Sequence, residues 1–397
     1  MLTPDARHYQ MKILLFDTPS RKKLFPLTLT RANADLRIGI FTLRERWEKL
    51  SGLQSVILTE DYLQDVYGAV TMDDYILVDA CLIPSPEMVK LLRQLKAGEA
   101  LADANGLIMG RPFSEEKPVY GEDLLKLFDN VSTINSARRI EFPYHLFQWN
   151  GEMISADFQL ATMERISKKS VEGVNIINAS QVFIEESATV HFSSLNATDG
   201  PIYIGKNALV MEGCHIRGPF VLGEGAVLKM GTKIYGATTI GPYCVGGGEI
   251  KNSVMMGFSN KAHDGYLGDS VIGEWCNLGA GTSNSNVKNN AGEVKSWNYY
   301  HNDYVPSGSK CGLIMGDYSR SSINTSFNTG TVVGISCNVF GQGLTQKFIA
   351  DFTWGAKDLS RYAFDKALQH ITNWMKFKNI ELDTNKLKVL KHIFDHY

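Results

Sequence analysis

Residues 204–241, IGKNALVMEGCHIRGPFVLGEGAVLKMGTKIYGATTIG, contain the repeat that decides the fold of this chain. Aliphatic residues recur at every sixth position, at Ile204, Val210, Ile216, Leu222, Leu228, Ile234 and Ile240. A glycine follows at every eighteenth position, at Gly205, Gly223 and Gly241. A spacing of six within eighteen matches neither the 3.6-residue period of a helix nor the two-residue period of a strand. It predicts a left-handed parallel β-helix, whose coils have three short strands and place glycine at turns where a Cβ would clash.

The composition indicates a soluble protein of two or three domains. The chain has 397 residues, a formal net charge of −2 and 44% hydrophobic residues, which gives no sign of a nucleic-acid or membrane partner. No apolar run approaches the ~20 residues of a bilayer-spanning helix, and the polar residues 1–10 indicate a leader rather than a signal peptide. Six cysteines without a C-x-x-C pair predict reduced thiols, with Cys214 and Cys244 as small core residues. We therefore expect a cytoplasmic protein.

The region before the repeat alternates between strand and helix patterns. Buried strands are predicted at 13–16, 55–58 and 75–78, and helices at 42–50, 60–67 and 86–96. This alternation predicts a small α/β domain with a largely parallel sheet over residues 11–155. A connecting helix is then expected within residues 156–172, with Phe158, Leu160, Met163 and Ile166 on its apolar side.

The coils are expected to occupy residues 173–350, interrupted by a polar excursion at 284–307. Residues 351–397 are predicted to form a helical cap over the open end of the β-helix. The first of its two helices is marked by Leu359, Tyr362, Phe364, Leu368, Ile371 and Trp374. The second begins after Asp383 or Thr384, either of which suits a helix N-cap.

The densest group of polar residues interrupts the coils between Glu249 and Asn286. Acyl transfer to an amine needs a base, for which imidazole is well suited because its ordinary pKa lies near neutral. It also needs donors for the oxyanion and cations for an anionic acceptor. A lone histidine such as His263 is more often a plain surface residue, so its neighbours must decide.

The segment KAHDGYLGDSVIGEWCNLGAGTSNSNV, residues 261–287, resembles the acetyltransferase half of a bifunctional family. This is the glucosamine-1-phosphate acetyltransferase / N-acetylglucosamine-1-phosphate uridylyltransferase family, with the pattern K-A-G-H-x-x-Y-L-G-D-x-x-I-G-x-x-x-N-I-G-A-G-T-x-x-x-N-Y. From His263 onward the match has no gap. Two departures are the missing glycine before His263 and the presence of Val287 in place of the family's tyrosine, which is a coenzyme contact in the family.

The resemblance implies a role for each matching residue. His263 would be the general base, and Asn286 would stabilise the oxyanion and, with Ala280, lie near the acetyl-CoA thioester. Lys251, Tyr266 and Asn277 would bind the sugar phosphate, and Lys233 would correspond to a further basic residue upstream. The resemblance also implies a homotrimer with its site between subunits.

The first domain resembles the nucleotidyltransferase half of the same family, which has a Rossmann-like fold. Its glycine-rich phosphate loop is absent, since no glycine occurs from Lys12 to Ile38. Basic residues remain there, and Arg21, Lys22 and Arg31 are candidates for binding a nucleoside triphosphate such as UTP. Asp79 follows a buried strand, in a segment similar to the family's G-D-V-P-L-I, whose aspartate holds Mg²⁺.

The whole chain resembles a diverged, Bacteroidetes-type branch of the family that also lacks the glycine loop. The segments that carry this likeness are PLTLTR at 26–31, ADLRIGI at 34–40 and SINTSFNTGTVVG at 322–334. We therefore expect acetyl-CoA-dependent N-acetylation of an amino-sugar phosphate, glucosamine 1-phosphate in the first instance. This step would serve UDP-N-acetylglucosamine-type synthesis for the cell envelope, with nucleotidyl transfer by the first domain left open.

Other functions stay open at this point. The β-helix could be an oligomerisation scaffold for a Mg²⁺-dependent nucleotidyltransferase, or the protein could bind a sugar nucleotide without turnover. A carbonic anhydrase on the same solenoid would need three zinc ligands, two of them at a fixed spacing on one coil. His191, His215, His263 and His301 show no such pair.

Overall fold

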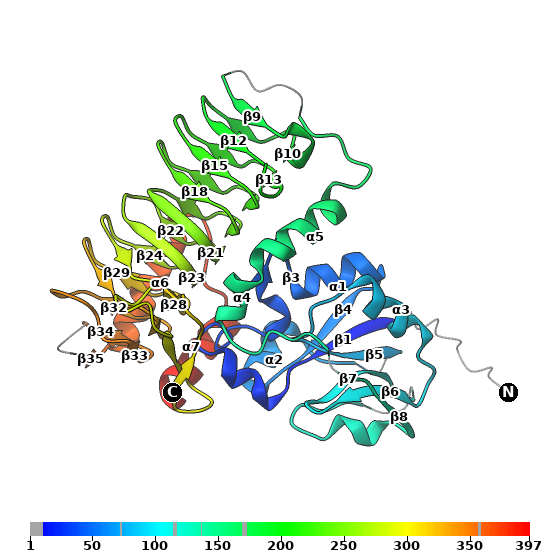
Figure 1. The fold of residues 1–397 in the computed structure, drawn as a ribbon. Coiled ribbons are helices and arrows are strands. Elements are labelled where there is room, and N and C mark those ends of the chain that lie inside the picture. Colours follow the sequence, from blue (N-terminus) through cyan, green and yellow to red (C-terminus); the bar gives the residue numbers. More distant parts are fainter. Residues whose placement is uncertain (1–10, 72–73, 114–116, 136, 169–172, 356–358) are drawn as a thin grey trace. The chain divides into compact units, whose positions relative to one another are not determined.

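The computed structural model describes residues 11–71, 74–113, 117–135, 137–168, 173–355 and 359–397 (Figure 1). The chain divides into two compact units. The first contains residues up to 21, 31–35 and 42–140, and the second contains 22–30, 36–41 and 141–397. The expected leader, residues 1–10, lies outside the described residues.

The first unit is an α/β domain built on one six-stranded sheet of order β4-β1-β5-β7-β6-β8. The central strand β1 pairs in parallel with β4 and β5, whereas β7 is antiparallel to both β5 and β6. The sheet strands are β1 (Lys12–Phe16), β4 (Ser55–Leu58), β5 (Tyr75–Asp79), β6 (Glu99–Asp103), β7 (Gly106–Arg111) and β8 (Asn130–Thr133). The helices are α1 (Leu43–Ser51), α2 (Asp61–Tyr67) and α3 (Pro86–Gln94), so the predicted alternation is confirmed.

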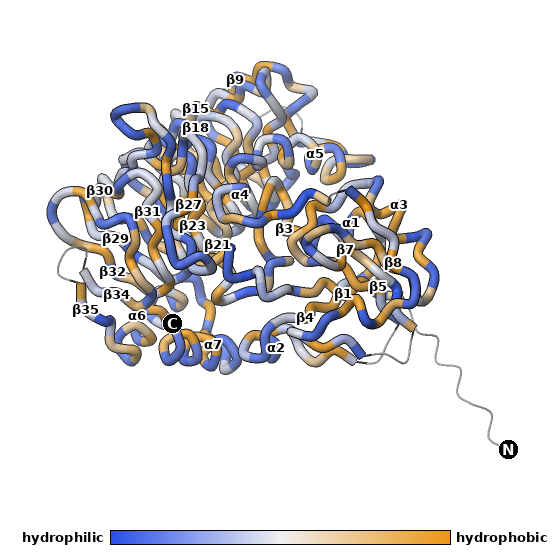
Figure 2. The backbone as a smooth tube through the Cα atoms, turned by 60° about the horizontal axis from the view of Figure 1, so that its bottom comes forward, coloured by the Kyte–Doolittle hydropathy of each residue, from blue (hydrophilic) through white to orange (hydrophobic). Residues whose placement is uncertain are grey.

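Strand β1 is buried on both sides, which explains its continuous apolar sequence. Ile13 and Leu15 belong to one hydrophobic cluster, and Leu14 and Phe16 belong to another. Such runs are typical of parallel strands covered on both faces. In Figure 2 the hydrophobic colour accordingly follows β1 and β5.

The second unit contains a parallel β-solenoid, which confirms the fold predicted from the six-residue repeat. Each coil crosses three faces in order. The first face carries β9 (Asn175–Ile177), β12 (Ser194–Asn196), β15 (His215–Arg217), β18 (Lys233–Tyr235), the first halves of β21 (Glu249–Gly257) and β23 (Tyr266–Glu274), and the two-stranded sheet β25 (Ser283–Asn284) and β30 (Ser326–Phe327). The second carries β10 (Val182–Ile184), β13 (Ile202–Ile204), β16 (Phe220–Leu222), β19 (Thr238–Ile240), the second halves of β21 and β23, β28 (Leu313–Met315), β31 (Thr331–Val333) and β33 (Phe348–Ile349). The third carries β11 (Thr189–Val190), β14 (Leu209–Val210), β17 (Val227–Leu228), β20 (Val245–Gly246), β22 (Asn260–Lys261), β24 (Asn277–Leu278), β29 (Arg320–Ser321), β32 (Asn338–Val339), β34 (Thr353–Trp354) and β35 (Ser360–Arg361).

The interior of the solenoid is a stack of the repeating aliphatic residues. All seven residues of the six-residue repeat are at most 2% exposed and belong to one hydrophobic cluster, together with Cys214 and Cys244. Each buried aliphatic side chain contributes about 1.5–3 kcal/mol relative to exposure. Gly205 and Gly223 occupy crowded turns, because a Cβ there would lie 2.9 Å and 2.7 Å from the backbone of the next coil.

The predicted connecting helix is wrong in position. The structure has α4 (Tyr144–Gln148) and α5 (Asn150–Thr162), which end before the predicted apolar residues Met163 and Ile166. These two side chains are 64% and 83% exposed. The buried side of α5 instead includes Asn150, whose Oδ1 accepts a hydrogen bond from the backbone N–H of Gly39 at 2.8 Å. This long-range contact, which no local period reveals, attaches residues 36–41 to the solenoid unit.

The remaining elements are a hairpin, two C-terminal helices and two short strands. The polar excursion forms an antiparallel hairpin, β26 (Lys295–Asn298) and β27 (Asp303–Pro306). Helices α6 (Phe364–Lys376) and α7 (Thr384–His396) confirm the two predicted C-terminal helices, and Asp383 is the N-cap of α7. The short strands β2 (Arg37–Ile38) and β3 (Phe41–Thr42) form a separate two-stranded sheet. None of the helices among the described residues combines the length and apolar composition of a membrane-spanning helix.

Candidate active site

His263 lies in the turn that joins β22 on the third face to β23 on the first face. Its side chain is exposed, and no hydrogen bond or ion pair to the imidazole is found within the described residues. The turn itself is held firmly: the N–H of Gly281 donates to Asp264 O at 3.0 Å from the next coil. Gly265 has φ +123°, and a Cβ there would lie 2.1 Å from Thr282 O. The imidazole is therefore free on a rigid backbone.

Lys261 supports this turn from inside the solenoid. The residue is 1% exposed, and its Nζ donates to the carbonyl oxygens of His263 at 2.6 Å and Gly247 at 3.1 Å. Burial lowers the pKa of Lys261 to about 8, although the nearby Asp264 carboxylate opposes this shift. Lys261 belongs to the quoted motif, but its role was missed because a lysine in a core position has no signature in a hydrophobic repeat.

We expect Lys261→Met to lower kcat by about 10-fold or more, since the His263 backbone loses its internal donor and small displacements of catalytic groups are costly.

The same variant also tests the lowered pKa of Lys261. Between pH 8 and the ordinary value of 10.5 the unfolded chain holds this proton more often than the folded chain, so the stability of the wild type gains as pH rises. The melting temperature of the wild type relative to Lys261→Met should rise from pH 7 to 10 by calorimetry. If the melting temperatures of the wild type and Lys261→Met change with pH in the same way, the lowered pKa of Lys261 is contradicted. The control is Lys206→Met, at an exposed lysine.

Tyr266 lies flat along the first face because Gly268 has no side chain. A Cβ at Gly268 would lie 2.1 Å from the Tyr266 hydroxyl oxygen and 2.4 Å from its ring carbon Cζ. The neighbouring strand places Lys251 opposite Gly268, so the Lys251 position adjoins the Tyr266 ring. Burial, with smaller contributions from the carboxylates of Asp269 and Glu249, raises the pKa of Tyr266 to about 12. The phenol therefore stays protonated at neutral pH.

A polar cluster at the end of this strand fixes Asn286. Its Nδ2 donates to Tyr266 Oη at 3.1 Å and also to Asp269 Oδ2. Asn252 Nδ2 donates to the other oxygen of Asp269 at 2.6 Å. Asp269 and Asn252 both have left-handed backbones at the corner between the first two faces (φ 48° and 45°), which asparagine and aspartate adopt more readily than most residues. The sequence analysis did not identify Asn252 and Asp269 as site residues. The occurrence of Asn or Asp at the same corner of successive coils is the signal that could have identified them.

Gly268→Ala should raise KM for the acceptor about 10-fold, because the new methyl group displaces Tyr266 and breaks its hydrogen bond with Asn286. Steady-state kinetics with a varied acceptor measure this effect. In a Tyr266→Ala background the same glycine substitution should have little further effect, because Gly268 acts through Tyr266. Gly257→Ala is the matched control, since its Cβ meets nothing closer than 3.4 Å. Additive effects of the two substitutions would contradict this role of Gly268.

The other expected site residues are divided between two faces. Lys233, Glu249 and Tyr266 stand side by side on three successive strands of the first face. The ammonium groups of Lys233 and Lys251 are exposed, and no carboxylate pairs with either one in the part of the chain that the structure describes. Asn277 instead lies on the third face, between Asn260 and Arg320. The structure therefore brings Lys233, Lys251, Tyr266 and Asn286 together and leaves Asn277 apart.

Ala280 lies in the turn that stacks beneath the His263 turn. Gly281, its neighbour, donates to Asp264 O across the two turns. Ala280 is half-buried, and its backbone N–H has no acceptor among the described residues. An unpaired N–H one coil from the imidazole is a suitable oxyanion donor. Both N–H groups of Asn286, by contrast, are already used within the cluster.

The candidate nucleotide-binding cations do not form one group. Arg21 is fully buried, where its guanidinium donates to Asp17 Oδ2 at 3.2 Å, Tyr62 Oη at 3.2 Å and Arg31 O at 3.0 Å. Arg31 is 6% exposed in the same unit, whereas the exposed Lys22 belongs to the second unit. Arg21 thus stabilises the loop after β1, where the glycine-rich loop was missing from the sequence.

Asp79 ends β5, as expected, but its carboxylate is occupied by protein donors. Oδ1 accepts the N–H of Cys81 at 2.9 Å, and Oδ2 accepts Nε of Arg139 at 2.6 Å. Arg139 also bridges to Asp103. No group of three or more metal-ligating side chains occurs in the described ranges. These residues do not fit Mg²⁺ as they stand, and Mg²⁺ at Asp79 stays a prediction that requires Arg139 to move.

Comparison with known proteins finds a family model and several relatives that match parts of this chain. Residues 13–166 match the model of the sugar nucleotidyl transferase family. The bifunctional protein GlmU of Heliobacterium modesticaldum is 26% identical over 282 residues, which cover 62% of this chain and 60% of that protein. This chain is similar to GlmU-type bifunctional proteins over part of its length. The family resemblance predicted from the His263 segment is therefore confirmed.

Two further relatives match shorter stretches. GlmU of Methanocaldococcus jannaschii is 35% identical over 106 residues, covering 27% of this chain and 26% of that protein. A protein of Sulfurisphaera tokodaii named bifunctional sugar-1-phosphate nucleotidylyltransferase/acetyltransferase is 30% identical over 165 residues, covering 36% of this chain and 41% of that protein. The chain thus spans between a quarter and 60% of the length of these relatives.

Proposed function

We propose that the solenoid catalyses N-acetylation of an amino-sugar phosphate with acetyl-CoA as donor. The observation that carries this proposal is the free imidazole of His263 at the edge of a face with two unpaired ammonium groups, Lys233 and Lys251. A base beside an anion site suits an acceptor that has both an amine and a phosphate. The name of the Sulfurisphaera tokodaii relative, which includes an acetyltransferase, supports the same reaction.

The chemistry follows from the positions of these groups. The acceptor amine attacks the thioester carbonyl, and His263 takes the proton that the nitrogen loses. The oxyanion is stabilised by the N–H of Ala280. The carbon–sulfur bond then breaks, the amide forms, and the proton on His263 passes to the coenzyme A thiolate. The phosphate binds at Lys251 and Lys233, and the protonated Tyr266 hydroxyl donates a hydrogen bond to the acceptor.

The division of residues between faces supports a homotrimer. Asn277 lies on the third face and Tyr266 on the first face of the same chain, with an edge of the solenoid between them. In a ring with threefold symmetry, the first face of one copy meets the third face of the next. Each site would then combine Tyr266, Lys251 and His263 of one chain with Asn277 of its neighbour.

The test is release of free thiol from acetyl-CoA in the presence of glucosamine 1-phosphate. We expect turnover by the wild type and a KM for this acceptor that is about 10-fold or more higher in Lys251→Ala, since a charge-assisted contact to phosphate is lost. Exposed Lys206, on a different corner of the solenoid, supplies the control Lys206→Ala. No thiol release with any of a panel of amino-sugar phosphates would overturn the proposal.

Nucleotidyl transfer is the second candidate function, because residues 13–166 match the sugar nucleotidyl transferase family. The measurement is pyrophosphate release from UTP with N-acetylglucosamine 1-phosphate, with and without Mg²⁺. The guanidinium of Arg21 stabilises the loop after β1. If this loop is needed for the reaction, Arg21→Ala should abolish pyrophosphate release. Pyrophosphate formation equal to a blank would exclude this second activity under the conditions used.

A further inference from the structure

Arg320 carries a buried positive charge for which the described residues supply no acidic partner. It lies on β29 of the third face and is only 8% exposed. Its Nε and Nη2 atoms are buried and have no hydrogen-bond acceptor, and the guanidinium carbon lies 5.5 Å from the centre of the Trp374 ring. Burial lowers the pKa of Arg320 to about 10, so the group is still charged at neutral pH. A buried cation without an acceptor is costly, and an anion would complete it.

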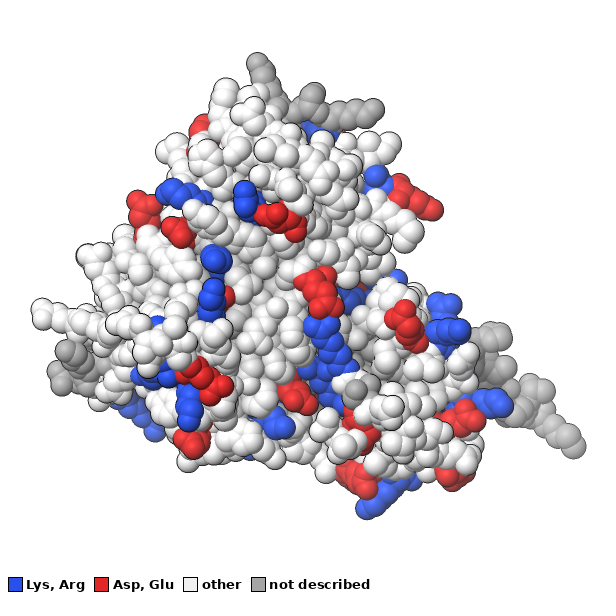
Figure 3. Space-filling model, in the orientation of Figure 1, with Lys and Arg blue, Asp and Glu red and all other residues white. Residues whose placement is uncertain are grey.

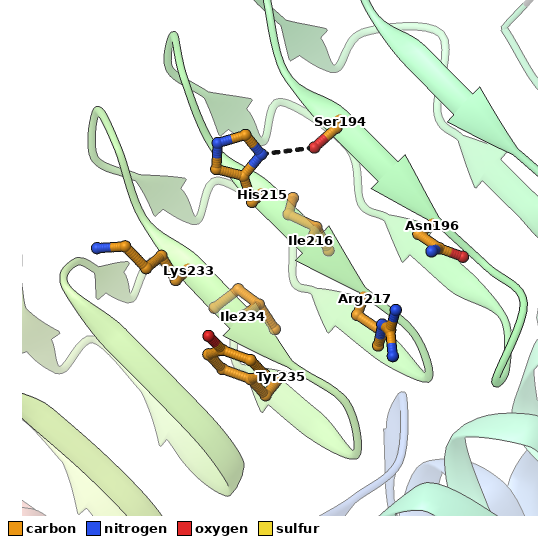
Figure 4. A pocket seen from close by; sticks show the side chains of 8 residues that line it. All are labelled: Ser194, Asn196, His215, Ile216, Arg217, Lys233, Ile234 and Tyr235. Carbon is orange, nitrogen blue, oxygen red and sulfur yellow. Dashed lines mark hydrogen bonds between the residues drawn. The ribbon is translucent and has the colours of Figure 1, made fainter.

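The cations on the first face of the solenoid differ from Arg320 because they reach solvent. Figure 3 shows basic side chains that stand singly or in small groups on the solenoid, among mostly uncharged surface. Arg217, which lines a cavity on the first face (Figure 4), has a side chain that is 57% exposed, and its Nη1 lies 3.3 Å from Asp199 Oδ2. An exposed and paired arginine needs no ligand, whereas the buried guanidinium of Arg320 does.

A cavity of about 300 Å³ lies between α6 and the last strands of the third face. This volume is at the lower end of the ~300–1,000 Å³ that is typical of small-molecule sites. The cavity is lined by Trp354, Ser360, Arg361, Tyr362, Ala363, Lys366 and His370. None of these lining residues is acidic, so the cavity is favourable for an anion.

The cavity and Arg320 lie along the same face of α6. Lys366, His370 and Trp374 follow one another at intervals of four residues, which places them on one side of the helix. Lys366 and His370 line the cavity, and Trp374 covers Arg320. Strand pairing places Trp354, at the other wall of the cavity, two strands from Arg320, or roughly 10 Å.

Tyr362 and His370 connect the cavity with the buried guanidinium. Their side chains are joined by a hydrogen bond between Oη and Nδ1. Burial raises the pKa of Tyr362 and lowers that of His370, and the charge of Arg320 lowers both. The guanidinium is therefore close enough to act on two side chains that line the cavity.

The donors in this region suit a phosphate group. Arg320 and Lys366 supply two cations, and the Tyr362 hydroxyl is a further donor. Arg361, by contrast, is already engaged, since its Nη2 donates to the carbonyl oxygen of Phe394 and its guanidinium lies 4.2 Å from the centre of that ring. The aromatic rings of Trp354 and Tyr362 offer apolar surface to the rest of a small molecule.

We propose that Arg320 and the cavity beside α6 form a binding site for a phosphate group of a small molecule, with Arg320 and Lys366 as its cations. This inference does not rest on the proposed acetyl transfer. A phosphate of the acyl donor and a phosphate of a separate metabolite offer the same chemistry. Asn277 lies one strand from Arg320 and three strands, or about 14 Å, from Trp354 along the third face, so an extended donor could reach the cavity.

The first experiment compares melting temperatures in inorganic phosphate and in chloride at equal ionic strength. Phosphate should raise the melting temperature of the wild type and of Arg217→Met by about 2 °C or more, and that of Arg320→Met by less than half as much. Lys366→Ala, at an exposed residue, should also lose part of the phosphate effect. In chloride, Arg320→Met should melt no lower than the wild type, because it lacks the unpaired buried charge.

Two results would overturn the site. One is a phosphate effect of the same size in the wild type and Arg320→Met. The other is a lower melting temperature of Arg320→Met in chloride, which would show that Trp374 alone satisfies the guanidinium.

Calorimetric titration with coenzyme A in phosphate-free buffer identifies the source of the phosphate group. A loss of coenzyme A affinity of about 10-fold or more in Arg320→Met, with normal affinity in Arg217→Met, would assign the site to a phosphate of the donor. Equal coenzyme A affinity in all three proteins, together with the phosphate effect on melting, would assign it to a separate phosphorylated molecule. Both readouts measure binding, so they hold whether or not acetyl transfer is found.

Discussion

Replacing His263 by alanine should lower kcat for acetyl transfer by about 10²–10⁴, because the amine would have to lose its proton to water instead of to a fixed base. KM for the acceptor should change little, since Lys251, Lys233 and Tyr266 remain in place. The measurement is thiol release at saturating acetyl-CoA and acceptor. The fold should be unaffected, because the imidazole is exposed and makes no hydrogen bond or ion pair within the described residues.

The chain contains a matched control for this substitution. His191 is an exposed histidine in the same kind of turn, between β11 on the third face and β12 on the first face, four coils earlier. His191→Ala should retain wild-type kcat. Equal kcat values for His263→Ala and the wild type would remove His263 from the mechanism, and equal losses in both variants would indicate a general effect on the solenoid.

Mixing two inactive variants should restore activity if each site is shared between chains. Asn277→Ala alone should reduce turnover about 10²-fold through loss of an acceptor contact, and His263→Ala alone more. In randomly mixed trimers about a quarter of the sites would combine an intact His263 of one chain with an intact Asn277 of its neighbour. Coexpressed, differently tagged chains purified over both tags contain only mixed trimers, each with one intact site in three, and should thus regain up to about a third of wild-type activity.

A matched pair tests the geometry behind this result. Lys251 and Tyr266 adjoin on one face of a single chain, so they belong to the same copy in any assembly. Mixtures of His263→Ala with Lys251→Ala should therefore restore no site, because both defects fall on one chain's contribution. Restoration by this second pair, or its failure for Asn277 with His263, would contradict the arrangement of first face against third face.

Much of the solenoid could be predicted because its signal is local and periodic. The aliphatic step from Ile204 to Ile240 specifies which side chains enter the core, and all seven do. The motif around His263 identified a candidate base by resemblance, and its exposed position in a turn was found only in the structure. The connecting helix was placed wrongly because Met163 and Ile166 have apolar spacing without burial, and a spacing does not state which surface covers it.

The first domain shows the same limit in a different way. Its strands and helices were predictable from buried runs and from caps such as Ser85, which accepts the N–H of Met88. The state of Asp79 was not, because its partner Arg139 is 60 residues away in the sequence. A carboxylate that follows a strand can bind a metal or an arginine, and only the folded chain decides between them.

The sequence by itself determined the repeat, the aliphatic core and the order of the two folds, since each depends on residues within one coil or one element. Only the tertiary structure decided which side chains meet. Tyr266 lies over Gly268, Asn286 joins Asp269 with Asn252, and Asn277 lies on another face. These neighbours come from different coils, and their alignment depends on the length of every coil between them. Local periodicity does not give the combined length of these coils, whereas the pairing of the stacked strands does.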